Sequence, residues 1–403
     1  HQRLDLWLDH FDSLWQTYTH AIPSATAGKT KPDVSLYDHS KATAAIAVAL
    51  WRYYEESKIL TEDIIKGLQY RKDWDQNQLL LIQGDLFGIQ NFIFSEGSQT
   101  NKQAAKLLRG RSFYVSLLAE TAALKILESL GLPTTSQIIN AAGKFLIVAP
   151  NTDTVKQQLK NLKLEINQWF LEKTYGQTGL GLAWQEACCN NFISSTKEDK
   201  NAFSQLISQL FSQLEEAKLQ RFDLCTQTAP NPVFCHYLDH FELGVCAYNN
   251  KLPADSEREG LSISSLSLDQ INTGEYLSKY SRFVISKEKL SGKSLALDLF
   301  GYYIYFTDNE EHSGKFGPQV KNNNIRRVYD FSLAEDEAEI LFNGYARRNI
   351  NTYVATFSSH DLTQQCYKYN GLNDEDTIEI KVGEIKPFTH LAYEDRVPSN
   401  KAM

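Results

Sequence analysis

The chain has 403 residues, and its 49 aspartates and glutamates outnumber its 41 lysines and arginines, for a net charge of −8. This excess of negative charge argues against broad, sequence-independent binding of nucleic acid, because the neutralisation of phosphates by lysine and arginine supplies most of that affinity. A hydrophobic content of 42% is enough to bury sizeable cores in two or more domains, no segment is apolar for long enough to span a membrane, and no signal peptide is visible. We therefore expect a cytoplasmic protein.

The first predicted elements are two amphipathic helices, over residues 5–18 and 40–54. Asp38 and His39 precede the second helix, and we interpret them as its cap. Residues 1–75 are assigned to this helical region and a linker.

A buried strand is predicted from the apolar run over residues 79–82. Gly84 follows it and is expected to let the backbone turn, because glycine has no Cβ. Asp85 then lies at the strand's end, where palm-type polymerases and cyclases hold a divalent metal with an acidic residue. The alternative is that Asp85 only caps a short helix over residues 88–94.

A long helix is predicted next, over residues 102–130. Basic residues gather near its start: Lys102, Lys106, Arg109 and Arg111. Two short apolar runs over residues 137–150 then indicate a β-hairpin. A second amphipathic helix over residues 151–170 and a glycine-containing strand over residues 175–184 complete the pattern.

This order of strand, helix, hairpin, helix and strand predicts an α+β fold with a ferredoxin-like palm of the βαββαβ type over residues 76–190. In a catalytic palm, the hairpin turn carries further carboxylates, because two metals on a triphosphate need several negative oxygens. Here the turn is Ala-Ala-Gly-Lys, and no GGDD sequence occurs in the chain. The palm is therefore catalytically incomplete. Gly143 and Lys144 remain candidates for contact with a nucleotide phosphate, or are solvated turn residues.

The remaining chain divides into a helical, cysteine-containing insertion over residues 191–290 and a β-rich segment over residues 291–403. Strands are predicted over residues 295–308, from Val328 onward, and at two edges over residues 351–356 and 377–382. A second group of basic residues lies in this segment: Lys321, Arg326, Arg327, Arg347 and Arg348. Both basic groups are candidates for contact with RNA or a partner, or are solvated faces.

Four segments occur in an order that matches a known family: residues 32–50, 83–94, 106–114 and 142–150. Together they resemble the large subunit of type III CRISPR effector complexes, the Cas ten family, in a III-A or III-D-like form. The resemblance begins at the end of the HD nuclease domain and covers the first palm and a zinc-ribbon insertion. It ends at residues 386–392, which look like the lead-in to a second palm. His1 is not an initiator Met, so we expect a part of a longer polypeptide.

The resemblance implies two reactions, cleavage of single-stranded DNA and synthesis of cyclic oligoadenylate from ATP with Mg or Mn. The HD metal pair and the GGDD motif are missing, so neither activity is assigned to this chain; the dipeptide at residues 360–361 is interpreted as a loop pair. Implied partners are guide CRISPR RNA, target RNA, a guide 5′-end-binding subunit, a small subunit and a second palm. Residues Gly84, Asp85, Gly143 and Lys144 would face that second palm across an ATP. The alternative is a stand-alone nucleotide-binding or cyclase-like regulatory protein.

The resemblance also implies a zinc ribbon, which needs two pairs of thiolates for a tetrahedral site. Cys246 keeps one sulfur of the first pair, and Ser264 and Ser267 stand where the second pair is expected. Cys225, Cys235 and His236 could contribute residual ligands, but their spacings fit no standard pattern. We therefore predict a degenerate ribbon held by packing, with zinc doubtful and the cysteines as thiols.

Overall fold

The computed structural model describes residues 4–25, 34–59, 61–97, 99–193, 202–226, 231–290, 297–307, 325–331, 346–347, 356–359 and 381–384. The chain divides into two compact units, residues 1–348 and 349–403. In the second unit, the backbone of Phe357 donates to Glu384 O and accepts from Gly383 N, each over 2.8 Å. Among the described helices, none is long and apolar enough to cross a membrane.

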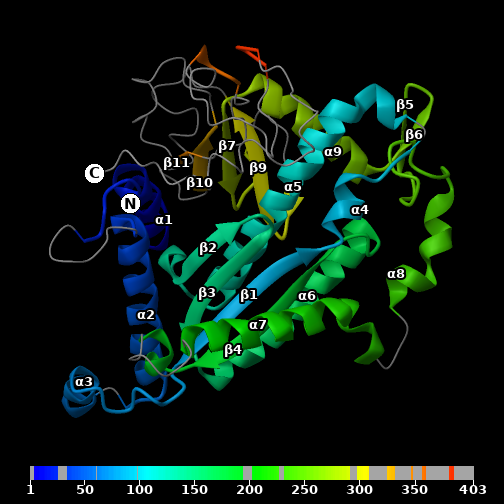
Figure 1. Ribbon diagram of the computed structural model, residues 1–403. Helices are drawn as coiled ribbons and strands as arrows, with labels where there is room; N and C mark the ends of the chain where they lie inside the picture. Colours follow the sequence, from blue (N-terminus) through cyan, green and yellow to red (C-terminus); the bar gives the residue numbers. More distant parts are fainter. Residues whose placement is uncertain are drawn as a thin grey trace, which may run out of the picture. The chain divides into compact units, whose positions relative to one another are not determined.

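A four-stranded antiparallel sheet forms the centre of the first unit (Figure 1). Its strands are β1 (Leu79–Phe87), β2 (Gln137–Ala141), β3 (Lys144–Pro150) and β4 (Gly179–Ala187), in the order β2-β3-β1-β4. Helix α5 (Thr100–Ser129) connects β1 to β2, and α6 (Asp153–Thr174) connects β3 to β4. The order of elements is the one that the sequence predicts, and the fold mixes helices and sheets as expected for an α+β protein.

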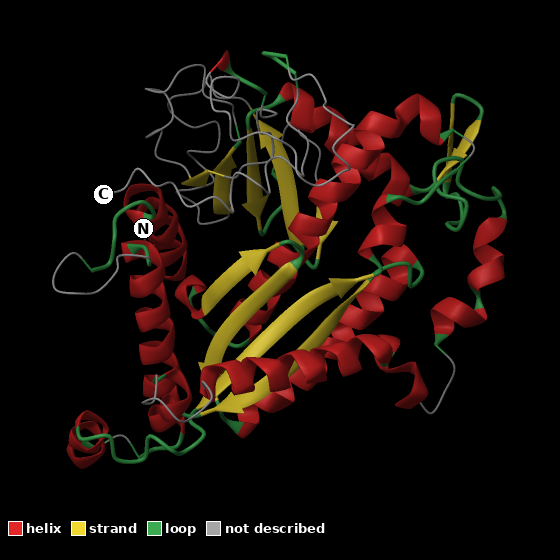
Figure 2. Cartoon of the chain, in the orientation of Figure 1, coloured by secondary structure: helices red, strands yellow, loops and turns green. Residues whose placement is uncertain are grey.

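Helices cover both faces of this sheet, which explains why β1 is a continuous apolar run (Figure 2). Alternate residues of a strand point to opposite faces, so Leu79 and Leu81 share one face and Leu80 and Ile82 the other. The first face packs against α2 (Leu36–Glu56) and α7 (Ala202–Leu219), in one buried apolar cluster. Helices α5 and α6 contact the sheet as well.

Two predictions around β1 are wrong in detail. The strand does not turn at Gly84 but continues to Phe87, because Gly84 pairs with Phe145 inside the sheet. A Cβ at Gly84 would lie 2.1 Å from Cζ of the Phe145 ring, so the glycine makes room for that ring. Asp85 is not a helix cap either, since Gly88, with a positive φ of 74°, precedes helix α4 (Ile89–Ile93).

The predicted hairpin is confirmed, with Ala142 and Gly143 between β2 and β3. Both have positive φ, 53° and 80°, as a two-residue turn of this hand requires.

The N-terminal elements are α1 (Leu4–Thr19), α2 and α3 (Glu62–Gln69). Helix α2 begins at Leu36, earlier than predicted, because Ser35 is its cap and accepts a hydrogen bond from Asp38 N over 3.0 Å. Asp38 therefore lies in the first turn of the helix, where a negative charge is favourable.

A second sheet has the order β11-β10-β7-β9-β8. Its strands are β7 (Arg282–Ser286), β8 (Leu297–Leu299), β9 (Tyr302–Thr307), β10 (Ile325–Asp330) and β11 (Ala346–Arg347). The single strand predicted over residues 295–308 is in fact the β8–β9 hairpin, which turns at Phe300 and Gly301 with positive φ. The strand predicted from Val328 begins at Ile325. The predicted edge strands at 351–356 and 377–382 lie almost entirely outside the described residues.

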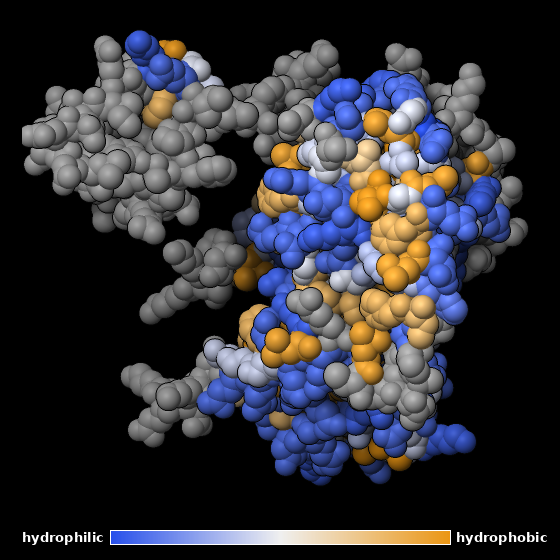
Figure 3. All heavy atoms as spheres, turned by 90° about the vertical axis from the view of Figure 1, so that its right-hand side faces the viewer, coloured by the Kyte–Doolittle hydropathy of each residue, from blue (hydrophilic) through white to orange (hydrophobic). Residues whose placement is uncertain are grey.

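After α7, the insertion between the sheets is built from short elements and one further long helix. These are η3 (Arg221–Thr226), α8 (Pro232–Cys235), η4 (Tyr237–Phe241), β5 (Ser256–Arg258), β6 (Leu261–Ile263) and α9 (Ser265–Lys279). Two other short turns lie beside the first sheet: η1 (Thr134–Ser136) precedes β2, and η2 (Cys189–Phe192) follows β4. Hydrophobic and hydrophilic side chains are interspersed on this side of the molecule (Figure 3). Exposed apolar side chains of the insertion include Phe234, Leu238, Leu243 and Val245.

Helix α9 packs tightly on α5 through two glycines. A Cβ at Gly110 would lie 1.9 Å from the Gln270 carbonyl oxygen, and one at Gly274 would lie 1.9 Å from the Lys106 carbonyl oxygen. No side chain fits at either position, so this contact fixes the insertion on the first sheet's long helix.

Candidate functional site

The carboxylate of Asp85 lies between two lysines from different elements. Lys218 Nζ, from α7, is 2.5 Å from Asp85 Oδ2, and Lys144 Nζ, from the start of β3, is 3.5 Å from the same oxygen. Asp85 is buried, with 5% of its side chain exposed, whereas Lys218 is 18% and Lys144 51% exposed. We call this group, Asp85, Lys144 and Lys218, the Asp85 site.

Local structure explains how the three side chains meet. Asp85 pairs with Lys144 across β1 and β3 and with Gly181 across β1 and β4, so all three positions lie on one row of the sheet. A Cβ at Gly181 would lie 2.7 Å from Lys218 Cγ. The missing side chain at Gly181 therefore lets Lys218 cross the sheet face and reach Asp85.

The charges of the Asp85 site favour a buried ion pair over a metal site. Burial by itself lowers the pKa of Lys218, but hydrogen bonds with Asp85 and Glu215 outweigh it and raise the pKa above its ordinary value. A divalent cation at Asp85 would face two ammonium groups and one carboxylate. Among the described residues there is no group of three His, Cys, Asp or Glu that could hold a metal ion. The residues present do not fit a catalytic Mg or Mn.

The two glycines predicted beside these residues shape the sheet and are not on the same surface. Gly84 faces Phe145, and a Cβ at Gly143 would lie 3.3 Å from Ile89 and 3.4 Å from Val115. Of the four residues predicted to contact a nucleotide, Asp85 and Lys144 are thus brought together. The sequence analysis missed Lys218, because nothing near it in the sequence indicates a partner in β1.

The basic residues at the start of α5 contact α9 and its surroundings. Lys106 Nζ is 3.0 Å from Glu275, and Arg109 donates to Gly274 O over 3.0 Å. Arg111 is buried, and its guanidinium donates to four groups: Gln270 Oε1, Ile93 O, Ser95 O and Tyr248 O. This corrects the expectation that Arg111 lies at a binding surface, since its donors satisfy backbone carbonyls in the interior. Lys102 is exposed.

The second basic group is also largely internal. Arg326 is buried 2.8 Å from Asp9 of α1, and Arg327 is buried 2.8 Å from Glu120 of α5. These ion pairs attach β10 to two helices, so the placement of Arg326 and Arg327 on a solvated face is wrong. For Arg347 only the backbone in β11 is described, and Lys321 and Arg348 lie outside the described residues.

A buried polar cluster stands where the zinc ribbon was expected. Ser264 Oγ is 3.3 Å from Cys246 Sγ and 3.0 Å from Ser267 Oγ, and Cys246 Sγ is 3.3 Å from Ser267 Oγ. Burial raises the pKa of the Cys246 thiol, but its hydrogen bonds with Ser264 and Ser267 outweigh this and lower the pKa. We call these three residues the Cys246 cluster.

The donor set of the Cys246 cluster does not fit structural zinc, which takes thiolates or imidazoles. Cys235 is exposed on α8, and His236 is exposed and paired with Asp239, so neither belongs to the buried cluster. The side chain of Cys225 lies outside the described ones.

In comparisons with known proteins, the central part of the chain matches a family model. The Csm1_B family, described as Csm1 subunit domain B, matches residues 78–231. This stretch contains the four-stranded sheet, α5, α6 and α7.

Relatives with assigned names agree with this match. The CRISPR system single-strand-specific deoxyribonuclease Cas10/Csm1 (subtype III-A) of Methanocaldococcus jannaschii is 33% identical over 240 residues, which cover 54% of this chain and 29% of that protein. The protein of the same name from Thermococcus onnurineus is 33% identical over 189 residues, 47% of this chain and 23% of that protein. The matched part thus spans less than a third of the length of these relatives.

Among solved structures, a Csm1–Csm4 cassette in complex with cA3 has a TM-score of 0.53 and 18% sequence identity, and the match covers 88% of this chain and 40% of that chain. At this sequence identity, the similarity shows a shared fold and nothing more. The chain resembles the large subunit of type III CRISPR effector complexes, as the sequence predicts.

Proposed function

We propose that this chain is a part of the large subunit of a type III CRISPR RNA-guided effector complex that acts in antiviral defence. In this proposal the sheet β2-β3-β1-β4 is a first palm that has no catalytic centre of its own. The complete protein makes cyclic oligoadenylate from ATP and cuts single-stranded DNA when target RNA binds. Both reactions use residues outside this chain. The match of residues 78–231 to the Csm1 subunit domain B supports the proposal.

The observation that carries the non-catalytic assignment is the Asp85 site. A palm that transfers nucleotidyl groups needs carboxylates that are not already paired with lysine or arginine, because they must bind two metal ions. Asp85 already has two cationic partners, Lys218 at 2.5 Å and Lys144 at 3.5 Å. The same strand position therefore serves to hold lysines in place, and catalytic Mg or Mn belongs to the second palm.

Lys144 is the residue of this site that can bind ATP. Half of its side chain is exposed, and its backbone lies at the end of a rigid hairpin. A lysine ammonium binds phosphate as a compact positive charge. In the proposal Lys144 contacts the phosphates of an ATP that bridges the two palms, with Asp85 and Lys218 beneath it and Gly143 supplying the turn.

The other segments take the roles that the resemblance implies. Residues 1–75 are the helical end of an HD-like domain, 76–190 the first palm, 191–290 the helical insertion with a degenerate zinc ribbon, and 291–403 the lead-in to the second palm. Guide CRISPR RNA, target RNA, the guide 5′-end-binding subunit and the small subunit are the proposed partners. The exposed Lys102 and the half-exposed Lys106 remain candidates for RNA contact, whereas buried arginines do not.

The test uses the complete protein in its complex. Lys144→Ala is expected to raise the KM for ATP in oligoadenylate synthesis about fivefold, because one charge-assisted contact with phosphate contributes about 1 kcal/mol. Asp85→Ala is expected to lower the rate as well, because it removes the carboxylate that positions Lys144. The matched control is Lys66→Ala, a lysine that is 64% exposed on α3. Wild-type rates in both Lys144→Ala and Asp85→Ala would exclude this role for the site.

A further inference from the structure

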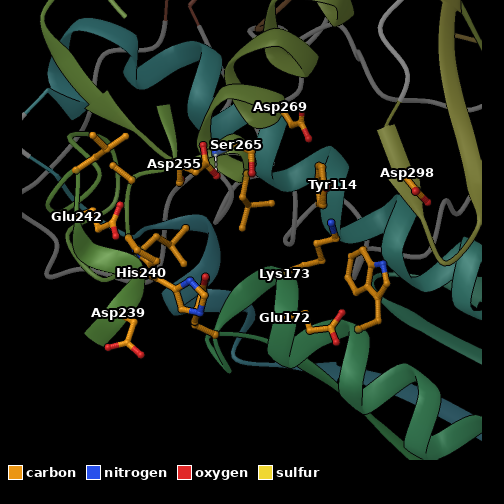
Figure 4. A pocket seen from close by; sticks show the side chains of 18 residues that line it. Tyr114, Glu172, Lys173, Asp239, His240, Glu242, Asp255, Ser265, Asp269 and Asp298 are labelled. Atoms are coloured by element: carbon orange, nitrogen blue, oxygen red, sulfur yellow. Dashed lines mark hydrogen bonds between the residues drawn. The ribbon is translucent and has the colours of Figure 1, made fainter. Parts of the chain in front are cut away.

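An open cavity lies at the junction of the insertion with α5 and α6, away from the Asp85 site. Its volume is about 590 Å³, which is within the range of small-molecule sites. Its walls come from α5, α6, the loop before β5, α9 and β8, and Figure 4 shows their side chains around the opening. Six carboxylates line the cavity: Glu172, Asp239, Glu242, Asp255, Asp269 and Asp298.

The residues that line the cavity are mainly acidic. Lys173 and His240 are the basic residues in the lining, against six carboxylates. Within the described part of the chain, the carboxylates of Glu242 and Asp269 have no hydrogen-bond or ion-pair partner. Burial raises the pKa of Asp269 to about 6, which Lys173 opposes and Asp255 reinforces. A positive charge placed beside Asp269 would remove this unfavourable burial of an unpaired carboxylate.

A second and independent observation is the hydroxyl of Tyr114. This side chain lines the cavity, is only 4% exposed, and has no hydrogen-bond partner among the described residues. The hydroxyls of largely buried tyrosines normally find a hydrogen-bond partner, and this one borders the open cavity. An N–H donor in the cavity would supply that partner. The ring of Trp169 also lines the wall and can attract a cation by its face.

The arrangement of the carboxylates limits the kind of cation. The described residues contain no group of three His, Cys, Asp or Glu close enough to hold a metal ion. The carboxylates come instead from separate elements, α6, α9 and β8 among them. A ligand that satisfies several of them must carry more than one positive charge on an extended framework.

We propose that this cavity binds an organic polycation of the polyamine class, with ammonium groups separated by methylene chains. One ammonium group donates to Asp269 and to the hydroxyl oxygen of Tyr114. A second reaches the carboxylate of Glu172 on α6. The methylene chain between them contacts the ring of Trp169. This site is independent of nucleotide binding at Asp85.

The test is isothermal titration calorimetry of the full chain with spermidine, at constant ionic strength. Wild-type protein is expected to bind about one spermidine, and Asp269→Asn to weaken binding about tenfold, since one ion pair in a sheltered site contributes on this scale. Tyr114→Phe should weaken it about threefold through the lost hydrogen bond. Glu62→Gln, a change at a carboxylate that is 91% exposed on α3, is the matched control and should leave binding unchanged.

A misfolded variant would also lose binding, so Glu172→Gln on α6 tests the second ammonium contact through a different element, and circular dichroism checks each fold. MgCl₂ is titrated in place of spermidine to separate a polyamine site from a metal site. The proposal is overturned if wild-type protein shows no saturable heat with spermidine, if Asp269→Asn and Glu172→Gln both bind as wild type, or if Mg²⁺ binds with the same dependence on Asp269.

Discussion

The Asp85 site and the Cys246 cluster are both places where a metal could have organised the chain, and they are held together by different means. At Asp85 the buried group is a carboxylate, and two lysines surround it. At Cys246 the buried group is a thiol, and two serine hydroxyls surround it.

The difference follows from the charge of the group that has to be buried. A carboxylate stays ionised at neutral pH unless burial is extreme, so without a metal it needs a cation nearby. A thiol with its ordinary pKa of about 8.5 is mostly neutral at neutral pH, so hydrogen bonds with uncharged hydroxyls are enough. Substitution of the residues that surround the buried group should therefore affect stability and metal binding differently at the Asp85 site and at the Cys246 cluster.

The largest expected effect is a gain of zinc binding at the Cys246 cluster. Ser264→Cys combined with Ser267→Cys would place three sulfurs within the span that now carries hydrogen bonds of 3.0 to 3.3 Å. With zinc at a thousandfold excess over its Kd, the double variant should be stabilised by about 4 kcal/mol. Bound zinc is measured by elemental analysis after dialysis, and thermal unfolding is compared with and without the metal. The wild-type chain is the control, and a double variant that retains no zinc would contradict the prediction.

A smaller loss is expected from Lys218→Met at the Asp85 site. This change leaves a carboxylate that is 5% exposed with only the half-exposed Lys144, so the free energy of unfolding should fall by about 2 kcal/mol. The measurement is the urea midpoint at neutral pH. Asp85→Asn added to Lys218→Met should recover most of the loss, because the charge that needed a partner is gone. Equal losses in the single and double variants would show that Lys218 acts through packing alone.

Asp269 extends the comparison to a partly buried carboxylate that has no ion-pair partner among the described residues. Burial raises its pKa to about 6, so the folded chain holds a proton that the unfolded chain has already lost. Stability should therefore decrease as the pH rises from about 4 to 7, by about 1 kcal/mol for this partly exposed group. Asp269→Asn should be more stable than wild type at neutral pH and equal to it near pH 4. Parallel pH profiles for the two proteins, measured by urea unfolding, would contradict this.

The smallest effect on stability is expected for Lys144→Ala. The ammonium is 51% exposed and lies 3.5 Å from Asp85, so it should contribute less than about 0.5 kcal/mol to folding. The same variant should nevertheless impair oligoadenylate synthesis in the complete protein. A loss of stability as large as that of Lys218→Met would mean that Lys144 holds the fold and is not available to bind phosphate.

Much of the first sheet and its helices could be predicted because the signals are local. The apolar run at residues 79–82, the helical spacing of residues 102–130 and the glycine at position 143 each depend on neighbouring residues. Errors arose where a tertiary contact changed the outcome. Gly84 was expected to turn the chain, but the ring of Phe145 on the adjacent strand needs its missing side chain.

The cysteine and the basic residues show the same difference between what local sequence signals predict and what tertiary contacts decide. The resemblance to a zinc ribbon singled out Ser264 and Ser267 as counterparts of Cys246, and the structure brings all three together. The clusters of arginines looked like surface stripes because charge is usually solvated. Arg111 and Arg327 are buried instead, since partners on distant elements, Tyr248 and Glu120, compensate for the loss of water.

The sequence by itself determined the order of helices and strands in the central sheet and the missing carboxylates of its hairpin, because periodicity and residue type act over short distances. Only the tertiary structure decided that Lys218 neutralises Asp85, that Gly110 and Gly274 hold two helices in contact, and that six carboxylates meet in one cavity. These features depend on residues far apart in the chain, and their free energy exists only once the backbone has brought the charges and surfaces together.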